Sequence, residues 1–404
     1  MTAAFVDRVK GQMAYEFART APPENFPALP DLPLGRYTDQ AMWQLEREHV
    51  FATSWIFVAH TSELEGAGAY RTIEVAGRPL VLVRGDDGEV RAFVNACRHR
   101  GAPVVRDECG TCRLMVCQYH SWSYDHLGQL VRVPDERDFV GLDPTERGLV
   151  PVRCEAWGGL LFVNLDDGAV PLLEWLGPLA DELMPVASAD MRVVARSSTT
   201  HRCNWKIMAE GFLEVYHAKT IHSQTVANVL RPAGAAISLV PNGHSRMITP
   251  YSEAVMASGR ESHQGLPAIP GLDELYDISN PAYALFPNMI TPLDKVGFPL
   301  LQFWPEGVDT TRLERIWLAP SEGVVPRHPT WDRRLEAFEV VMEEDTKNLE
   351  PIQKSVEAAA HGGIPLNYQE RRIWHFHAQI DRMIGAEHVP EALRVPDLLA
   401  DWVD

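Results

Sequence analysis

The sequence has little positive charge for its length, and this absence excludes some partners. Its 404 residues contain 37 Lys and Arg against 55 Asp and Glu, a formal net charge of -18. Nucleic acids and anionic membranes favour clustered basic residues. No segment approaches the roughly eighteen apolar residues of a membrane helix, and the N-terminus MTAAFVDRVKGQMAYEFART lacks the layout of a secretory signal. We expect a soluble cytoplasmic protein with no nucleic-acid or membrane partner.

Cysteine is also scarce, and its placement excludes a disulfide framework. The six cysteines lie at positions 97, 109, 112, 117, 154 and 203, four of them within 21 residues. This distribution cannot staple a chain of this length. Clustered thiols in a reducing compartment more often bind metal or take part in redox chemistry. No Gly-rich nucleotide-binding turn is recognisable in the sequence either.

Short segments in which side chains alternate between apolar and polar occupy the region from about residue 69 to 165. They are rich in β-branched residues and are separated by turn signals such as Gly-Arg-Pro and Asp-Asp-Gly. We predict strands over 71–77, 78–85, 89–96, 114–124, 129–134 and 159–165. These strands predict an all-β domain over residues 48–165.

Beyond residue 166 the pattern mixes helix and strand. We predict helices over 171–185, 205–219, 331–359 and 367–385, and strands of an antiparallel sheet over 246–251, 297–305 and 311–320. The expected fold class is therefore α+β, with an N-terminal all-β domain and a second domain over 166–404. Residues 1–47, Pro-rich and then helical in pattern, are expected to pack on the second domain.

Two Cys and two His in the β domain have the spacing of a metal centre. Cys97-x-His99 is followed after seventeen residues by Cys117-x-x-His120. Two thiolates and two imidazoles on two hairpin tips can hold one zinc ion or a two-iron cluster. Each half supplies one Cys and one His, which suits a cluster with one iron on two Cys and the other on two His.

Cys109-x-x-Cys112 offers a competing arrangement. With Cys117 and His120 it would form a zinc knuckle, whose two halves are separated by only four residues. That spacing is tight for a tetrahedral ion and would leave Cys97 without a role. We therefore favour the two-iron cluster.

A second candidate lies in the stretch LEVYHAKTIH at 213–222. Fifteen histidines in one chain produce close pairs by chance, so His217 and His222 are not a metal site by spacing alone. Five residues turn a helix by about 140°, so the helix must bend or end between them if both face one ion. Glu214 and His217 share a helical face, so the carboxylate can reach the second ring nitrogen.

The most suitable third ligand is Asp345. It falls on a helical stripe of spacing three and four whose other members are apolar: Leu335, Phe338, Met342, Leu349 and Ile352. Burying an unpaired carboxylate is costly, and a neighbouring cation removes that cost. Two His and one carboxylate form the facial triad of non-haem Fe(II) oxygenases. An exposed Asp at a helix end is the alternative, and Glu343 and Glu344 are expected on solvated faces.

These motifs together resemble the large (α) subunit of Rieske non-haem iron ring-hydroxylating oxygenases. CRHRGAPV and CQYHSWSYDHLGQL resemble the two cluster loops, and NWKIMAEGFLEVYHAKTIH resembles the catalytic helix. The resemblance implies that the four Cys and His hold a [2Fe-2S] cluster and that His217, His222 and Asp345 hold a mononuclear Fe(II). It further implies that Glu214 bridges the two centres and that Asn204 lies close to the iron.

The resemblance also implies partners and a reaction. We expect a terminal oxygenase that uses O2 to hydroxylate an aromatic or other apolar organic substrate. A separate NAD(P)H-dependent reductase or ferredoxin would supply electrons, and the subunits would form a homotrimer, with or without a β subunit. The alternatives are oxygenation of a quaternary amine, oxidative demethylation and, more distantly, a Rieske electron carrier or a structural zinc protein.

Overall fold

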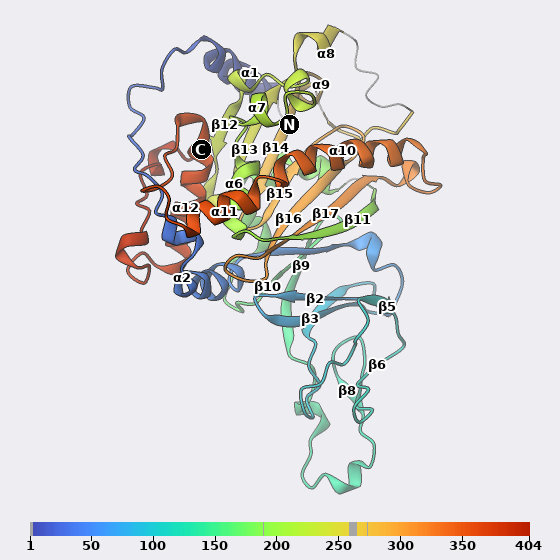
Figure 1. Ribbon diagram of the computed structural model, residues 1–404. Helices are drawn as coiled ribbons and strands as arrows, with labels where there is room; N and C mark the ends of the chain where they lie inside the picture. Colours follow the sequence, from blue (N-terminus) through green and yellow to red (C-terminus); the bar gives the residue numbers. More distant parts are fainter. Residues whose placement is uncertain (1–2, 189, 258–264, 273) are drawn as a thin grey trace. The chain divides into compact units, whose positions relative to one another are not determined.

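The structure, a computed structural model, describes residues 3–188, 190–257, 265–272 and 274–404. The chain divides into two compact units (Figure 1). One comprises residues 1–50 together with 176–404, and the other comprises residues 51–175.

The smaller unit is built from antiparallel β-strands. Seven form a sheet in the order β1-β10-β9-β4-β3-β2-β5, and β6, β7 and β8 form a second, three-stranded sheet. The bounds are β1 Ile56–His60, β2 Ala69–Val75, β3 Arg78–Arg84, β4 Val90–Val94, β5 Cys109–Thr111, β6 Met115–Val116, β7 Ser123–Tyr124, β8 Leu130–Arg132, β9 Pro151–Trp157 and β10 Leu160–Asn164. The period-two runs form strands because their β-branched and aromatic residues pack into a shared core.

One predicted strand of this unit is wrong. The stretch 114–124 forms only the two-residue strands β6 and β7, and residues 117–122 between them make a tight loop. The alternation of apolar residues continues across this loop, so the pattern alone did not reveal the interruption. The loop places Cys117 and His120 at a hairpin tip.

The larger unit contains the antiparallel sheet that the sequence predicts, in the order β11-β17-β16-β15-β14-β13-β12. The bounds are β11 Met191–His201, β12 Ala236–Leu239, β13 Ser245–Pro250, β14 Ser279–Leu285, β15 Met289–Pro292, β16 Phe298–Pro305 and β17 Thr311–Pro320. The α+β fold class is confirmed, and the sequence had indicated only β13, β16 and β17 of these strands.

Helices surround this sheet, and α10 packs on it (Figure 1). Trp331 of α10 lies in one hydrophobic cluster with Val194 of β11 and Trp317 of β17. The helices are α1 Ala3–Ala18, α2 Gln40–Leu45, α4 Pro178–Glu182, α5 Met184–Ala187, α6 Trp205–Leu213, α7 Ala218–Ile221, α8 Glu253–Ala257, α9 Leu275–Ile278, α10 Thr330–Thr346, α11 Leu349–Glu357 and α12 Arg371–Ile384, with α3 Leu172–Leu176 at the boundary of the two units.

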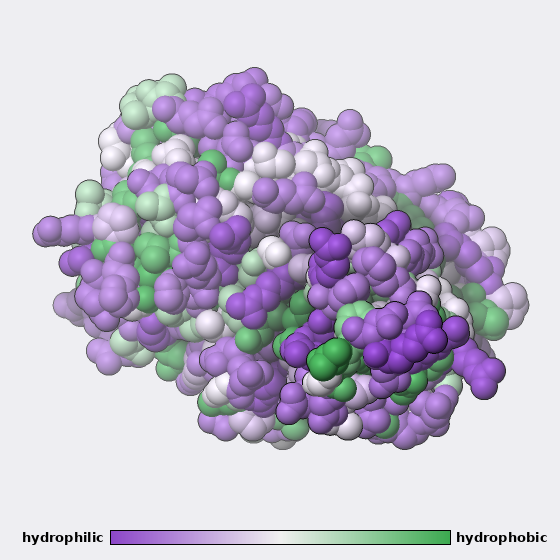
Figure 2. Space-filling view, turned by 90° about the horizontal axis from the view of Figure 1, so that it is seen from below, coloured by the Kyte–Doolittle hydropathy of each residue, from purple (hydrophilic) through white to green (hydrophobic). Residues whose placement is uncertain are grey.

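Three long predicted helices are interrupted. The segment 171–185 forms the short helices α3 and α4 and the start of α5. The segment 205–219 leaves the helical conformation after Leu213 and resumes it in α7, and the segment 331–359 is divided into α10 and α11 at Lys347 and Asn348. The last two interruptions lie beside the candidate metal ligands. The surface in Figure 2 is mostly hydrophilic with small apolar groups, as the acidic composition indicates. In the described part of the chain, no helix combines the length and apolar character needed to cross a membrane.

Candidate functional site

The two loops that carry the Cys and His pairs of the β unit are closed by the same pair of backbone hydrogen bonds. In the first loop the amide of Cys97 donates to the carbonyl of Ala102, and the amide of Gly101 donates to the carbonyl of Cys97. In the second loop Cys117 donates to Trp122, and Ser121 donates to Cys117.

Gly101 and Ser121 occupy equivalent positions in these loops and share a left-handed backbone, with φ of 77° and 58°. Such a conformation is unfavourable for Ser and is retained mainly at functional sites. The shared geometry therefore presents one Cys and one His from each loop in a matched pair.

The side chains of these loops converge. Cys97 and Cys117 are both buried free thiols, and burial raises the pKa of Cys97, with a smaller contribution from Cys117. The rings of His99 and His120 lie 4.6 Å apart, centroid to centroid. The Nδ1 atom of His99 is buried and has no hydrogen-bond partner among the described residues. Two adjacent protonated thiols and an unsatisfied imidazole nitrogen fit a metal cluster that would deprotonate the thiols and bind the nitrogen.

Two neighbouring aromatic side chains support this centre, and sequence reasoning did not identify them. Trp122 stacks on His99 with an interplanar angle of 11° and a centroid distance of 5.0 Å. The hydroxyl of Tyr124 lies 3.3 Å from the sulfur of Cys97 and accepts a hydrogen bond from the amide of Arg98. Trp122 and Tyr124 both lie within the segment CQYHSWSYDHLGQL, but only the tertiary contacts reveal their partners.

The zinc knuckle is not formed. In the described part of the chain, the one group of three or more Cys, His, Asp or Glu whose donor atoms lie within 4.8 Å of one another is formed by His217, His222 and Asp345. Cys109 and Cys112 therefore do not gather with Cys117 around a single ion. Cys97, His99, Cys117 and His120 do not form such a single-ion group either, as expected for ligands that are divided between two irons.

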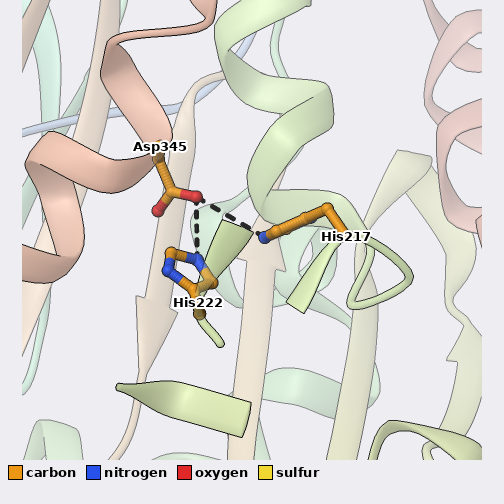
Figure 3. Close-up of side chains that lie close together, drawn as sticks. All are labelled: His217, His222 and Asp345. Atoms are coloured by element: carbon orange, nitrogen blue, oxygen red, sulfur yellow. Dashed lines mark ion pairs between the residues drawn. The ribbon is translucent and has the colours of Figure 1, made fainter. Parts of the chain in front are cut away.

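The three residues of that group come from two segments of the larger unit (Figure 3). His217 and His222 flank the four-residue helix α7, and Asp345 lies in the last turn of α10. The Oδ1 atom of Asp345 is 2.9 Å from Nε2 of His222 and 3.5 Å from Nε2 of His217. The two histidine rings meet edge to face at a centroid distance of 5.2 Å.

The helix ends before His217, which differs from the expected break between the two histidines. Glu214 is the C-cap of α6 in an extended conformation (φ -135°, ψ 171°). Its carboxylate accepts hydrogen bonds from the amides of Tyr216 and His217 and from Nδ1 of His217. The predicted contact between Glu214 and His217 is therefore present, but it is made by a turn and not by a shared helical face.

Glu344 holds the other histidine, contrary to our expectation of a solvated face. Its Oε2 accepts hydrogen bonds from Nδ1 of His222 at 2.7 Å and from the hydroxyl of Thr225 at 2.6 Å. The Glu344 side chain is 19% exposed. The only sequence signal was its place beside Asp345 in a run of three acids.

The hydrogen bonds to Glu214 and Glu344 determine which ring nitrogen of His217 and His222 faces Asp345. An ionised carboxylate only accepts hydrogen bonds, so Nδ1 of each ring carries the proton and Nε2 carries the lone pair. Both lone pairs then face Asp345, whose oxygens also only accept. Burial lowers the pKa of His222, but the carboxylates of Asp345 and Glu344 outweigh it and raise that pKa, so the site favours a positive charge at Nε2. The arrangement requires a positive charge among the three donors, and two imidazoles with one carboxylate fit a divalent metal ion.

The predicted apolar stripe around Asp345 is present in part. Met342 and Leu349 are buried, whereas Ile352 is 42% exposed because the chain turns at the junction of α10 and α11. The side chain of Asp345 is 14% exposed. It therefore faces a cavity and not the close-packed interior.

A cavity of about 500 Å³ opens beside the three donors. This volume lies in the usual range for small-molecule sites. The side chains that line it are mainly apolar: Phe212, Val215, Ala218, Val226, Val229, Leu230, Met247, Tyr251, Ala282, Pro292, Pro299, Leu301, Trp317, Ala337, Phe338, Val341 and Met342. The charged side chains on its wall, besides the donors, are Glu214, Asp294 and Arg334.

Asn204 does not join this group. It is buried at the N-cap of α6, where its side chain accepts from the amide of Lys206 and donates to the carbonyl of Val308. Nine helical residues, about 13 Å, separate it from Glu214, and it is not among the residues that line the cavity. The expectation that Asn204 approaches the metal is corrected: its amide is committed to helix capping.

Residues 54–150 match the family model of the Rieske [2Fe-2S] domain, and residues 188–386 match that of the ring hydroxylating alpha subunit (catalytic domain). The chain belongs to the α subunits of Rieske ring-hydroxylating oxygenases. The family's first domain holds a [2Fe-2S] cluster and its second holds a mononuclear iron, and the donor sets described above fit both groups.

Curated relatives in this family differ in what they are named for. The carnitine monooxygenase oxygenase subunit of Escherichia coli K12 is 37% identical over 206 residues, 50% of this chain and 55% of the relative. The benzene 1,2-dioxygenase subunit alpha of Pseudomonas putida is 37% identical over 190 residues, 46% of this chain and 42% of the relative. The chain thus aligns with about half the length of these relatives.

Solved structures share the α-subunit fold over most of the chain. A quaternary ammonium Rieske monooxygenase superimposes with a TM-score of 0.76 at 22% identity, covering 92% of this chain and all of that one. Naphthalene 1,2-dioxygenase from Rhodococcus sp. gives a TM-score of 0.74 at 22% identity over 96% of this chain. At this identity the likeness concerns the fold alone.

Proposed function

We propose that this α subunit is a terminal oxygenase that uses O2 to hydroxylate an organic substrate with a largely apolar body. The observation that carries the proposal is the position of His217, His222 and Asp345 on the wall of a mainly apolar cavity. A Rieske domain over 48–165 and a catalytic domain over 166–404 divide the work. When bound, the cluster supplies one-electron transfer and the iron supplies O2 activation.

The residues of the β unit prepare the electron-transfer site. Cys97, Cys117, His99 and His120 would hold the cluster. Trp122 fixes the plane of the His99 ring by stacking, and the hydroxyl of Tyr124 would donate a hydrogen bond to the sulfur of Cys97 once that sulfur is a thiolate. His120 is exposed, so its ring edge is available to an electron donor or acceptor.

The residues of the larger unit prepare the oxygenation site. Glu214 and Glu344 hold the protons on Nδ1 of His217 and His222, which directs both Nε2 atoms to the metal. Apolar side chains on the cavity wall exclude water and place the substrate beside the open side of the triad. His217, His222 and Asp345 would hold the iron, and the iron would supply the activation of O2.

Glu214 is proposed to connect subunits. It is 11% exposed, and its neighbour Tyr216 is 63% exposed, so this turn reaches the protein surface. A carboxylate here can accept from His217 and from His120 of a neighbouring chain. We therefore propose a homotrimer in which electrons cross between subunits, supplied by a separate NAD(P)H-dependent reductase or ferredoxin.

The decisive experiment is a substrate screen with the purified holoprotein, NADH and a reductase. We expect at least one apolar compound to stimulate consumption of NADH and O2 and to yield a product labelled from 18O2, while Asp345→Ala yields none. Electron delivery to the cluster without labelled product from any compound in a broad panel would contradict the proposal.

A second candidate substrate is a quaternary amine. Two observations favour it: a relative named for carnitine oxidation, and the aromatic side chains Phe212, Tyr251, Trp317 and Phe338 on the cavity wall. Aromatic faces attract trimethylammonium groups. Oxidative demethylation would use the same metals. Including γ-butyrobetaine in the screen beside the analogue in which an uncharged tert-butyl group replaces its trimethylammonium group distinguishes the classes, because only a cation-binding site prefers the former.

A further inference from the structure

Arg372 of helix α12 is a buried cation that the proposed function does not use. Its side chain is fully buried. Its Nε atom donates to Oγ of Ser245 at 2.9 Å, and its Nη1 atom donates to the carbonyl of Leu213 at 3.1 Å. Both oxygens are uncharged, and Nη2 has no hydrogen-bond partner among the described residues. Burial lowers the pKa of this guanidinium, and the charge of Arg371 lowers it further. Burying a charge in such surroundings is costly, so packing alone does not explain Arg372.

The preceding residue, Arg371, is also buried but has the contacts of a structural arginine. It donates to the carbonyls of Tyr368 and Ile237 at 2.9 Å and 3.1 Å. Its guanidinium lies 4.0 Å from the ring centre of Tyr368, and its Nη2 atom lies 3.6 Å from a carboxylate oxygen of Glu16. None of these partners belongs to α6. The two neighbouring arginines therefore differ in which part of the molecule they hold.

Helix α12 contacts α6 at both ends of the shorter helix. In the first turn of α6, the ring of Trp205 meets that of Phe376 edge to face at a centroid distance of 5.3 Å. In the last turn of α6, the carbonyl of Leu213 accepts the hydrogen bond from Arg372. The nine residues of α6 are therefore held against α12 along their whole length.

A third contact, between Glu210 and His377, lies between these two. The Nε atom of Arg36 donates to Nδ1 of His377 at 2.8 Å, so the proton of this ring is on Nε2. That Nε2 donates to Oε1 of Glu210 at 2.7 Å, and the hydroxyl of Tyr37 donates to the same oxygen at 2.9 Å. Since Glu210 lies three residues before Leu213, two polar contacts about one turn apart fix the rotation of the end of α6.

The Leu213 carbonyl is the point from which the histidine turn begins. A carbonyl in the last turn of a helix has no partner within the helix, and basic side chains often supply one. The next residue, Glu214, is extended, and its carboxylate accepts hydrogen bonds from the amides of Tyr216 and His217. The same carboxylate accepts from Nδ1 of His217. A chain of direct contacts thus runs from Arg372 to the His217 ring.

We propose that Arg372 is a positioning residue for the mononuclear iron site. By holding the Leu213 carbonyl it ends α6 at that residue and fixes the following turn, so that Glu214 keeps Nε2 of His217 directed at the metal. Arg372 does not line the cavity among the described residues, and it acts through the backbone of α6. This inference rests on the proposed ligand role of His217 and adds to it the group that holds the ligand's turn in place.

The test compares Arg372→Gln with Arg371→Gln in the purified holoprotein. Both substitutions remove a buried guanidinium from α12, so both should lower the thermal midpoint. Only Arg372→Gln is expected to weaken mononuclear iron binding, by about 10-fold, which is the smaller effect of losing a group that orients a ligand. Equilibrium dialysis against an iron chelator measures this affinity.

Hydrogen exchange provides a second measurement that does not involve the metal. The amides of Tyr216 and His217 are held by the Glu214 carboxylate. Mass spectrometry of peptides that cover residues 214–218 should show exchange about 10-fold faster in Arg372→Gln, because local opening of the turn becomes easier. Arg371→Gln should exchange there as the wild type does. Arg372→Lys keeps a charged donor and should recover part of both properties.

Two results would overturn the proposal. One is wild-type iron affinity and exchange in Arg372→Gln, and the other is an equal loss in Arg371→Gln, which would indicate a general effect on folding. If Arg372→Gln does not fold, Ser245→Ala replaces it, with Arg371→Lys as the milder control. Ser245→Ala removes the other partner of the guanidinium and should cause a smaller loss in the same direction. A Ser245→Ala variant that matches the wild type in both measurements overturns the proposal.

His217→Ala separates this outcome from that of the proposed ligands. It should lose the mononuclear iron with Arg372 intact. If His217→Ala keeps the iron, the ligand assignment fails and the positioning role fails with it. If His217→Ala loses the iron while Arg372→Gln retains wild-type affinity and exchange, only the role of Arg372 is refuted.

Discussion

Glu344 accepts a hydrogen bond at 2.7 Å from Nδ1 of His222, although 122 residues separate them in the chain. Because Asp345 faces the opposite nitrogen of the same ring, two consecutive acids of α10 hold both sides of one imidazole. Removing the Glu344 carboxylate should make the His222 ring more mobile without removing a metal ligand. We predict that Glu344→Gln weakens mononuclear iron binding by about 10- to 100-fold, the usual effect of losing such a partner.

Equilibrium dialysis against an iron chelator measures this effect. The adjacent Glu343 is exposed, so Glu343→Gln is the control and should bind iron as the wild type does. Equal iron affinity in the two variants would show that Glu344 has no part in the site.

Replacing Asp345 by Ala should remove the mononuclear iron while leaving the cluster intact. The proposed ligand sets belong to different compact units, and two imidazoles alone bind iron weakly. Iron analysis should fall from about three to about two per chain, since the cluster accounts for two, and the visible spectrum should not change. Full iron occupancy in this variant would transfer the ligand role to another acid.

For the cluster, Cys97→Ser is expected to bleach the visible spectrum. A hydroxyl is a poor replacement for a soft thiolate on iron, and Cys97 lies beside Cys117 in the buried centre. Cys109→Ser is the control because this thiol is exposed on β5. Colour that survives the first substitution and disappears with the second would contradict the assignment.

Glu214→Gln should keep both metals and a reducible cluster but lower turnover steeply. The amide keeps the size of the side chain and loses the charge that holds Nδ1 of His217. We expect a reduction in rate of about 100-fold or more, corresponding to about 3 kcal/mol. Stopped-flow reduction of the cluster and single-turnover oxidation measure the two steps separately, and loss of either metal would indicate a structural role instead.

Co-expression of two inactive variants tests whether electrons cross between chains. Cys97→Ser lacks a cluster and Asp345→Ala lacks the mononuclear iron. If the centres work across a subunit boundary, mixed oligomers pair an intact cluster with an intact iron, and activity returns in part. Mixtures that stay inactive would confine electron transfer to single chains and refute the bridging role of Glu214.

Glu210 should make the stability of the protein depend on pH. Burial raises the pKa of its carboxyl to about 8, while hydrogen bonding from Tyr37 opposes this shift. The pKa of a Glu side chain in the unfolded chain is about 4.3. The neutral Glu210 carboxyl therefore contributes its full stabilisation of the folded state below that pH, and this contribution is lost as the pH rises toward 8.

Glu210→Gln cannot ionise and should lose less stability over this window. We predict that its thermal midpoint gains a few degrees on that of the wild type between pH 6 and pH 9, measured by circular dichroism. Glu336→Gln, at an exposed position of α10, should follow the wild type. Parallel curves for wild type and Glu210→Gln would contradict the raised pKa.

The sequence by itself determined the chemistry of both centres. Metal donors must be particular residue types at short spacing, so Cys97-x-His99 and Cys117-x-x-His120 were visible without a structure. The spacing of His217 and His222 and the helical stripe through Asp345 likewise brought together donors that the structure places within 4.8 Å. The α+β class followed from hydrophobic periodicity, because burial imposes period two on strands and about 3.6 on helices.

Only the tertiary structure decided how those donors are held and what surrounds them. Helix α6 ends at Leu213 because Glu214 adopts an extended C-cap that binds the next turn, a local competition that periodicity does not record. The partnership of Glu344 with His222, and the place of Arg334 on the cavity wall, depend on the packing of α10 against segments more than a hundred residues away. Contacts between residues so far apart in the chain leave no signature in a single sequence. A Glu or Arg that makes such a contact has the same neighbours in sequence as one that is exposed to solvent.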